Sequence, residues 1–435
     1  MAAVFDNGVA RLIHADARAI PLPEKSVHCV VTSPPYWGLR NYSLGEWTGG
    51  DPDCEHKSSQ LIAGGQNSPK QNQHPGSQGS GGPCTLCGAV LTPEGIGLEQ
   101  TFDEWLDNMR TVAREVWRVL RDDGTFWLNI GDAYWGGKGA SSGTTERHEA
   151  RQSPTLNKLH QHTGRKGSTR PTDRRDQGFK PKTLLGMPWR LAFALQEDDW
   201  IIRSDIIWHK PNPMPESVRD RPTSSYEHIF MLTKQPAYFY DADAIRTPAD
   251  GWHGRDKSAG NKSAELHRMG GRGANPNRPL FPDQTSANSR NVWAFPTQGR
   301  KENHFASFPD ELPRRCILAG TSEHGVCAEC GAPWERVVDR ETMEINRSSR
   351  THPFGHTRPS GTMTKPPSAK TTAWQPSCDC DADVVPATVL DPFVGSGTTC
   401  VVAQRLGRNS IGIDLNAEYL GIARSRIDET PLRLF

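Results

Sequence analysis

Two short motifs near opposite ends of this 435-residue chain each follow a run of apolar, mostly β-branched residues. Thr32-Ser33-Pro34-Pro35-Tyr36 follows residues 27–31, and Asp391-Pro392-Phe393-Val394-Gly395-Ser396-Gly397-Thr398-Thr399 follows residues 384–390. Such runs are typical of buried parallel strands, and open α/β sheets bind ligands at the carboxyl ends of their strands. The pattern therefore predicts one sheet that is assembled from both chain ends, with two binding sites along one edge.

The rest of the sequence alternates between strand and helix patterns. Apolar residues recur at helical spacing from Phe102 to Leu120, and Thr101 with Glu104 has the spacing of a capping box. Further helices are predicted at residues 184–197, 309–318, 398–406 and 417–427. Strands are predicted at residues 12–16, 27–32, 125–130, 200–208, 225–233, 384–390 and 410–414, with 200–208 and 225–233 as an antiparallel pair. We therefore expect an α/β fold with a mostly parallel sheet and helices on both faces.

Composition indicates that much of the chain lies in loops, because it contains 41 Gly and 34 Pro and its mean hydropathy is −0.66. We expect one catalytic domain of ordinary size with large insertions. The formal net charge of +1 excludes a uniformly basic or acidic surface. Residues 138–182 and 246–301 nevertheless hold more Lys and Arg than Asp and Glu, as nucleic-acid-binding surfaces do. Solvated loops would have the same composition, and for residues 138–182 that alternative stays open.

No stretch of the sequence reaches the roughly 18 apolar residues of a membrane span. The N-terminal residues include Asp6, Arg11 and His14 and lack the apolar core of a signal peptide. We therefore expect a cytoplasmic protein. In that compartment, ten cysteines indicate metal sites or unpaired thiols rather than a disulfide framework.

The C-terminal motif has the features of a nucleotide-type site. Gly395 and Gly397 let the backbone approach a ligand closely, and the helix predicted after them offers its N-terminal amides to an anionic group such as a carboxylate. Asp414 ends the next predicted strand, where a carboxylate commonly binds ribose hydroxyls. Cys400 stands where a dinucleotide fingerprint has its third glycine, and the motif lacks the lysine of a Walker loop.

The N-terminal motif predicts a site for an amino group. Pro34 and Pro35 have fixed φ angles and no N–H donors, so their carbonyls are rigid acceptors. Ser33 adds a hydroxyl acceptor, and Tyr36 offers a flat ring for stacking on a base. Two acceptors on the hydrogens of an aromatic amine favour a tetrahedral, nucleophilic nitrogen that can attack a methyl group directly. The alternative is a strand that ends in a Pro-Pro turn with a packed tyrosine.

Together, the two motifs resemble the catalytic and S-adenosyl-L-methionine (AdoMet) motifs of the beta-group DNA amino-methyltransferases, and they follow the order of that group. His304-Phe305-Ala306-Ser307-Phe308-Pro309 is similar to the segment ahead of the cofactor loop, and Gly412-Ile413-Asp414 to the ribose-binding strand. The resemblance implies a Rossmann-like methyltransferase fold with a seven-stranded type of sheet and a circularly permuted motif order. It implies catalytic roles for Ser33, Pro34, Pro35 and Tyr36. It assigns AdoMet binding to Asp16, Thr32, Phe305, Asp391, Pro392, Phe393, Gly395, Ser396, Gly397, Thr398, Thr399 and Asp414.

Ser33 resembles the first catalytic residue of the cytosine-N4 branch, whereas adenine-N6 members usually carry Asp or Asn there. We therefore expect site-specific methylation of cytosine N4 in double-stranded DNA, with the base flipped out of the duplex. Three alternatives stay open: adenine-N6 methylation, methylation of RNA or protein, and a non-catalytic, zinc-bearing DNA-binding protein of the same fold. A cognate restriction endonuclease and homodimer formation are open as well.

Eight potential metal ligands lie in two insertions. Cys54, His56, Cys84 and Cys87 belong to the first, and Cys327, Cys330, Cys378 and Cys380 to the second. Each set can complete a closed tetrahedral site, so we expect two structural Zn²⁺ ions in zinc-ribbon-like insertions, with surface thiols as the alternative. The remaining cysteines in apolar patterns are predicted to be core residues: Cys29, Cys316 and Cys400.

These assignments divide the chain into five parts. Residues 1–42 and 100–240 form the catalytic part of the methyltransferase domain, and residues 301–320 and 384–435 form its AdoMet-binding part. Residues 43–99 and 321–383 are the two insertions, and residues 241–300 are the predicted target-recognition region.

Three further side chains are candidates for contact with DNA. Lys210, after the strand at 200–208, is a candidate for a phosphate or the target base, with a solvated charge as the alternative. Trp37 and Trp135 are candidates for stacking, with half-buried positions in loops as the alternative.

Overall fold

The structure, a computed structural model, describes residues 3–38, 45–51, 53–54, 84, 86–93, 95–135, 178–180, 182–248, 286–298, 308–341, 344–351, 357–365 and 368–432. The chain divides into two compact units. Unit 1 comprises Met1–Phe239, Asn291–Gly320 and Pro386–Phe435, and unit 2 comprises Tyr240–Arg290 and Thr321–Val385. None of the helices in the described part of the chain has the length and apolar character needed to cross a membrane.

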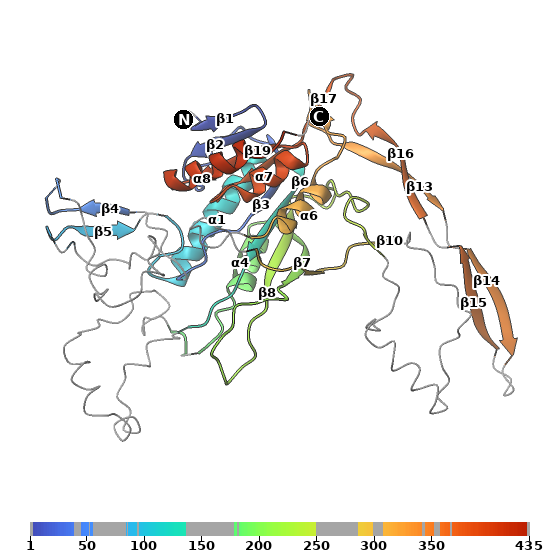
Figure 1. The fold of residues 1–435 in the computed structure, drawn as a ribbon, viewed down its shortest axis with the longest axis horizontal. Helices are drawn as coiled ribbons and strands as arrows, with labels where there is room; N and C mark the ends of the chain where they lie inside the picture. Colours follow the sequence, from blue (N-terminus) through green and yellow to red (C-terminus); the bar gives the residue numbers. More distant parts are fainter. Residues whose placement is uncertain are drawn as a thin grey trace. The chain divides into compact units, whose positions relative to one another are not determined.

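Within the described residues, unit 1 contains a nine-stranded sheet with the order β1-β2-β19-β18-β3-β6-β8-β7-β11 (Figure 1). In that order the strands are β1 (Phe5–Asp6), β2 (Ala10–His14), β19 (Asn409–Asp414), β18 (Thr388–Asp391), β3 (Val27–Thr32), β6 (Leu120–Ile130), β8 (Tyr226–Thr233), β7 (Ile201–His209) and β11 (Val292–Ala294). The neighbours from β2 to β6 all run parallel, and β8 runs antiparallel to β6 and β7. The predicted mostly parallel sheet and the predicted antiparallel pair are therefore confirmed.

The C-terminal segment of the chain supplies two strands at the centre of this sheet. β18 lies between β19 and β3, and Leu390 is in register with Val30. From β18 the chain continues to β19 on one side, while from β3 it continues through α1 (Phe102–Val119) to β6 on the other. The connections diverge between β18 and β3, and such a switch point is where open α/β sheets bind ligands.

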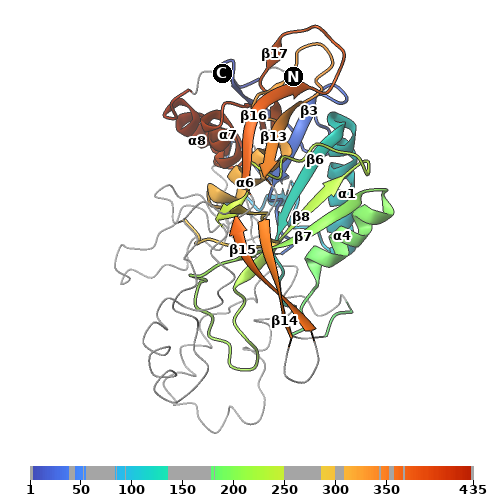
Figure 2. The same ribbon diagram turned by 90° about the vertical axis from the view of Figure 1, so that its right-hand side faces the viewer.

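Helices cover both faces of the sheet (Figure 2). α1 and α4 (Met187–Glu197) lie on one face, and α6 (Glu311–Gly320), α7 (Thr398–Arg405) and α8 (Ala417–Asp428) lie on the other. The predicted capping box of α1 is present, because Thr101 and Glu104 each accept a hydrogen bond from the other's backbone amide. Side chains alternate between two apolar cores: Ile13 of β2 packs with residues of α1 and α4, and Leu12 packs with residues of α7 and α8.

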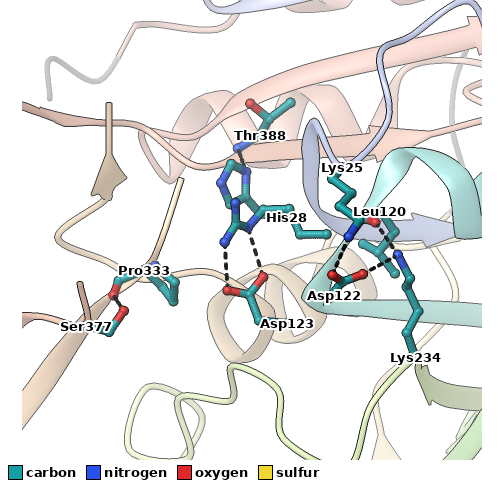
Figure 3. Close-up of polar contacts among 10 residues, drawn as sticks. Lys25, His28, Leu120, Asp122, Asp123, Lys234, Pro333, Ser377 and Thr388 are labelled. Carbon is teal, nitrogen blue, oxygen red and sulfur yellow. Dashed lines mark hydrogen bonds and ion pairs between the residues drawn. The ribbon is translucent and has the colours of Figure 1, made fainter. Parts of the chain in front are cut away.

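Polar contacts hold the amino-terminal edge of the parallel strands (Figure 3). The Thr388 amide, at the start of β18, donates a 3.0 Å hydrogen bond to Nδ1 of His28 in β3. Asp122 at the start of β6 pairs with Lys25 (2.6 Å) and with Lys234 (2.9 Å). The hydrogen bonds from these two lysines lower the pKa of Asp122. The buried Lys234 ammonium therefore has an opposite charge beside it, as a buried charge requires.

Several elements differ from the sequence prediction. The predicted strand at 384–390 is divided at Pro386, which has no N–H for a sheet, into β17 (Val384–Val385) in unit 2 and β18 in unit 1. β6 begins at Leu120, ahead of Gly124, whose lack of a Cβ lets it lie against the His28 carbonyl. The sequence pattern also misses β11, since three residues are too few to show a period.

Unit 2 contains short antiparallel pairs of strands. They are β12 (Val326–Cys327) with β17, β13 (Trp334–Glu341) with β16 (Ser368–Pro376), β14 (Glu344–Thr351) with β15 (Thr357–Lys365), and β9 (Thr247–Pro248) with β10 (Ser286–Ala287). A similar pair in unit 1 joins β4 (Gly45–Thr48) and β5 (Val90–Pro93). The sequence indicates insertions here but no strands, because these segments are polar and show no clear alternation of apolar residues.

Candidate active site at the carboxyl ends of the strands

The two motifs meet at the carboxyl ends of β3 and β18. The Thr32 hydroxyl donates a 2.6 Å hydrogen bond to Oδ1 of Asp391, and the Thr399 hydroxyl donates one of 2.6 Å to Oδ2. The Phe393 amide also donates to Oδ1 of Asp391 (3.1 Å). Thr32, Asp391 and Thr399 are each only 1% exposed. The buried carboxylate of Asp391 therefore links the end of β3 to Phe393 and Thr399 of the C-terminal loop.

The carboxyl group of Asp391 has a raised pKa. Burial raises the pKa of its carboxyl group to about 6, although the hydrogen bonds from Thr32 and Thr399 act in the opposite direction. Each of the three contacts has a hydroxyl or an amide as donor, so the arrangement fits the ionised carboxylate.

The glycine-rich loop after β18 packs against α8. Gly395 and Gly397 have φ angles of +48° and +79°, which favour glycine. A Cβ on Gly397 would come within 2.9 Å of the Ala423 Cβ in α8. The Arg426 guanidinium donates hydrogen bonds to the Ser396 carbonyl and hydroxyl. The Ser396 and Thr398 side chains are almost fully buried, so their contacts shape the loop from the inside.

Two more carboxylates stand at the same edge. Oδ2 of Asp414, at the end of β19, accepts from the Gly395 amide (2.9 Å), and its Oδ1 accepts from the Asn416 amide (2.8 Å). Burial raises the pKa of Asp414. Asp16, just past β2, pairs with Arg18 through both carboxylate oxygens. Burial opposes ionisation of Asp16, but the hydrogen bonds and charge of Arg18 outweigh it and lower the pKa.

A second polar network surrounds the N-terminal motif. The Tyr36 hydroxyl lies 3.2 Å from the Ser33 hydroxyl and donates a 3.0 Å hydrogen bond to Oε2 of Glu227. The Asn129 amide nitrogen, on β6, lies within 3.3 Å of Ser33, Tyr36 and Glu227 oxygens. Lys210, just past β7, pairs with Oε1 of Glu227 at 2.5 Å. Ser33 and Tyr36 are thereby fixed by residues from three further strand ends.

The two proline carbonyls of this motif differ in their contacts. The Trp105 indole N–H, on α1, donates a 3.0 Å hydrogen bond to the Pro35 carbonyl. Among the described residues, none donates a hydrogen bond to the Pro34 carbonyl. Within the described part of the chain, the Pro34 carbonyl is therefore an acceptor next to Ser33 without a protein donor.

Comparison with known proteins identifies the family of the chain. The model of the N6/N4 DNA methylase family matches residues 27–329 and 386–425. The chain is 33% identical to the type II methyltransferase M.SmaI of Serratia marcescens over 96% of this chain and 90% of the relative. It is 33% identical to the type II methyltransferase M.Cfr9I of Citrobacter freundii over 97% of this chain and 88% of the relative.

The chain belongs to the N6/N4 DNA methylase family. The resemblance to the AdoMet-dependent, beta-group DNA amino-methyltransferases is thereby confirmed. A cytosine-N4-specific PvuII DNA methyltransferase is among the similar solved structures, with 13% identity, a TM-score of 0.46 and coverage of 96% of this chain and 86% of that chain.

The structure of this methylase brings most of the predicted site residues to one edge of the sheet. The predicted cofactor residue Phe305 lies outside the described residues. The side chains of Thr32, Asp391, Ser396, Thr398 and Thr399 are buried and bonded within the protein, so they are suited to hold the loops in place. Direct contact of these side chains with AdoMet stays a prediction.

The sequence reasoning missed two members of the methylase network, Asn129 and Glu227. Asn129 stands out in hindsight as a polar residue inside the apolar run at 126–130, close to a predicted strand end. Glu227 gives no such signal, because a charge at the start of a strand is common on protein surfaces. The solvated-charge alternative for Lys210 is wrong, since its ammonium pairs with Glu227 and lies 4.5 Å from the centre of the Trp208 ring.

The tryptophan candidates for stacking on DNA prove to be core residues. Trp37 and Trp135 are 0% and 2% exposed, and their rings stack on each other with centroids 5.9 Å apart. Apolar burial of these rings therefore replaces the predicted DNA contact. Cys29, Cys316 and Cys400 are fully buried, as predicted.

The predicted metal ligands gather into two clusters. Cys327, Cys330, Cys378 and Cys380 form one, and Cys54, Cys84 and Cys87 form the other, each with its sulfur atoms within 4.8 Å of one another. His56, the predicted fourth ligand beside Cys54, Cys84 and Cys87, lies outside the described residues.

Proposed function

We propose that this methylase transfers a methyl group from AdoMet to N4 of a cytosine that is flipped out of double-stranded DNA. The observation that carries the proposal is the contact of the Ser33 hydroxyl with the Tyr36 hydroxyl, which itself donates to Glu227. Ser33 stands at the first position of the catalytic tetrapeptide, where the resemblance favours cytosine over adenine. Its hydroxyl belongs to a hydrogen-bond chain that ends on a carboxylate.

That chain sets the direction of each hydroxyl proton. Glu227 accepts from Tyr36, so the only proton of the Tyr36 hydroxyl is used there. Ser33 must then donate its proton to Tyr36. One lone pair of the Ser33 oxygen faces the Asn129 amide nitrogen at 3.3 Å, and the other is an acceptor for an amino hydrogen of the target base.

The Pro34 carbonyl supplies the second acceptor. An amino group that donates one hydrogen to Ser33 and the other to Pro34 loses conjugation with its ring and gains nucleophilic character. Trp105 fixes the adjacent Pro35 carbonyl, which keeps the Pro-Pro segment in one conformation. Tyr36 would stack its ring on the flipped base, as aromatic side chains do in enzymes that flip bases.

The C-terminal loop fits AdoMet. Gly395 and Gly397 adopt φ angles that bring backbone amides close to a ligand, and α7 begins directly after them, where an amino-acid carboxylate is favoured. Asp414 and Asp16 stand at the ends of the two neighbouring strands, where we assign them to the ribose hydroxyls and to the adenine. When bound there, AdoMet supplies the electrophilic methyl group.

The same chain offers an exit for the proton that methylation releases. The methylated nitrogen carries one excess proton, which passes to Ser33 as the Ser33 proton moves to Tyr36 and the Tyr36 proton moves to Glu227. Glu227 is then protonated, and the one proton that the amine loses is accounted for. Lys210 holds Glu227 in place through its other oxygen. Glu227 and Lys210 are positioning residues in this account, since neither touches the base.

Double-stranded DNA is the proposed substrate, and residues 241–300 remain the proposed target-recognition region. Residues 249–285 and 299–300 of that region lie outside the described residues. A cognate restriction endonuclease and a homodimer remain untested predictions.

Long-read sequencing tests the function in cells. The protein and its Ser33→Ala variant would be expressed in a host that lacks DNA methylation. We expect N4-methylcytosine at one recurring sequence with the unaltered protein and none with the variant. N6-methyladenine in its place would favour the adenine alternative and overturn the assignment to cytosine.

A further inference from the structure

Four cysteine sulfurs converge in unit 2. Cys327 and Cys330 lie at β12, and Cys378 and Cys380 follow β16. Their sulfur atoms all lie within 4.8 Å of one another, and no disulfide joins them. Four thiolates around a zinc ion, with Zn–S bonds of about 2.3 Å, stand about 3.8 Å apart. The cluster therefore has the ligand type, number and spacing of a closed tetrahedral zinc site.

The backbone around the first pair is shaped to present two sulfurs on one side. The Cys327 amide donates to the Ala332 carbonyl (2.9 Å), and the Gly331 amide donates to the Cys327 carbonyl (2.9 Å). Gly331 has a φ angle of +71°, which favours glycine. This tight turn brings the sulfur atoms of Cys327 and Cys330 close together.

The same turn recurs in unit 1 at Cys84-x-x-Cys87-Gly88-Ala89. There the Cys84 amide donates to the Ala89 carbonyl (2.6 Å), and the Gly88 amide donates to the Cys84 carbonyl (2.8 Å). Gly88 has a φ angle of +76°. The third sulfur of that cluster, on Cys54, lies 3.9 Å from the Cys84 sulfur. Two separate segments thus form the same type of turn, and further cysteine sulfurs lie close to each turn.

The second pair is held against the first by contacts outside the sulfurs. The Ser377 hydroxyl donates a 2.6 Å hydrogen bond to the Pro333 carbonyl (Figure 3). The Ala328 amide donates a 2.8 Å hydrogen bond to the Asp383 carbonyl. Segments that are separated by the long β13–β16 insertion therefore meet at the four thiols.

Apolar burial contributes little to the described part of unit 2. Among its described residues, the buried apolar side chains are Ile245, Val326 and Cys327. The remaining interior contacts are polar or aromatic, such as Arg336 between Asp241 and the Trp374 ring. Where so few apolar side chains are buried, a bound metal can contribute much of the free energy of folding. The four thiols can supply the metal site.

We propose that Cys327, Cys330, Cys378 and Cys380 bind one structural Zn²⁺ ion, which unit 2 needs to fold. Four thiolates leave no open position for water, so the ion has no part in methyl transfer. The ion joins the segment after β16 to the turn that follows β12.

Metal analysis of the purified full-length protein tests the proposal without DNA or AdoMet, so the outcome does not depend on the proposed function. The double variant Cys378→Ser/Cys380→Ser would be compared with the unaltered protein and with Asp379→Ser, an exposed control between the two cysteines. We expect the double variant to lose one zinc per chain and the control to lose none. Equal zinc contents in all three proteins would overturn the proposal.

X-ray absorption at the zinc edge covers the case in which the double variant does not fold. In the unaltered protein, we expect a first shell dominated by sulfur at about 2.3 Å. A shell of nitrogen and oxygen alone, or a protein without zinc, would refute the site. Hydrogen exchange after removal of the metal should show loss of protection in residues 326–341 and 368–385, while β3 and β6 stay protected; unchanged protection there would refute the structural role.

Discussion

The Thr32 hydroxyl donates a 2.6 Å hydrogen bond to the buried Asp391 carboxylate, across 359 positions of the sequence. Thr32 is the last residue of β3, and Asp391 is the last residue of β18. The bond joins the segment that we assign to the amine with the segment that we assign to the methyl donor. Because both side chains are buried, this hydrogen bond fixes the position of the loop after β3 relative to the loop after β18.

Replacement of Thr32 by Val removes this bond and keeps the shape of the side chain. We expect the free energy of unfolding to fall by about 1–3 kcal/mol, because a buried carboxylate loses one donor. Thr32→Ser is the matched control, since it keeps the hydroxyl. Urea unfolding monitored by circular dichroism measures both, and equal losses in the two variants would argue against the hydrogen bond as the cause.

The raised pKa of Asp391 predicts a pH dependence. Because the pKa is about 6 in the folded protein, the folded state binds this proton more tightly than the unfolded chain. The buried carboxylate therefore costs folding free energy at neutral pH, and that cost is lost as the pH falls through about 6. Protonation, however, turns one acceptor into a donor and disturbs the loop. We expect AdoMet affinity, measured by calorimetry, to fall as the pH falls through about 6, and Asp391→Asn to show no such midpoint.

Glu227→Gln tests the direction of the hydroxyl protons. The amide can turn its N–H toward Tyr36, which would reverse the chain and leave Ser33 without a fixed acceptor role. We expect kcat to fall by about 10²-fold or more, with little change in the Kd for AdoMet. Glu24→Gln, on an exposed residue, is the control. A merely structural role for Glu227 would show itself as an equal loss of AdoMet binding and thermal stability.

Gly397→Ala tests the cofactor loop. Alanine is strained at a φ angle of +79°, and its Cβ would press against Ala423 of α8. Left-handed backbone alone costs about 1–2 kcal/mol, so we expect the Kd for AdoMet to rise about tenfold or more. Gly421→Ala in α8, where a Cβ meets no atom within 4 Å, serves as the control. Unchanged affinity in Gly397→Ala would separate this loop from the cofactor.

The sequence predicts most of unit 1 because its elements have strong local signals. Thr101 and Glu104 predict the start of α1, and the apolar runs before Thr32 and Asp391 predict β3 and β18. The order of the motifs places both in one sheet. These signals depend on residues that are near one another in the chain, which is why they can be read without a structure.

Contacts between distant polar residues leave no such local signal. Glu227 and Asn129 meet Tyr36 only because β8 and β6 are neighbours in the sheet. Trp37 is in a loop motif beside Tyr36, yet packing against Trp135 buries it completely. The strand pairs of unit 2 are similarly hidden, because polar strands lack an apolar period.

The assignment of Ser33 to a cytosine is tested most directly by nucleoside analysis. Purified protein would be incubated with AdoMet and unmethylated double-stranded DNA, and the DNA would be digested and analysed by mass spectrometry. We expect N4-methyldeoxycytidine as the only methylated nucleoside, with its rate of formation reduced about 10²-fold or more in Ser33→Ala. N6-methyldeoxyadenosine in its place, or no methylated nucleoside at all, would contradict the assignment.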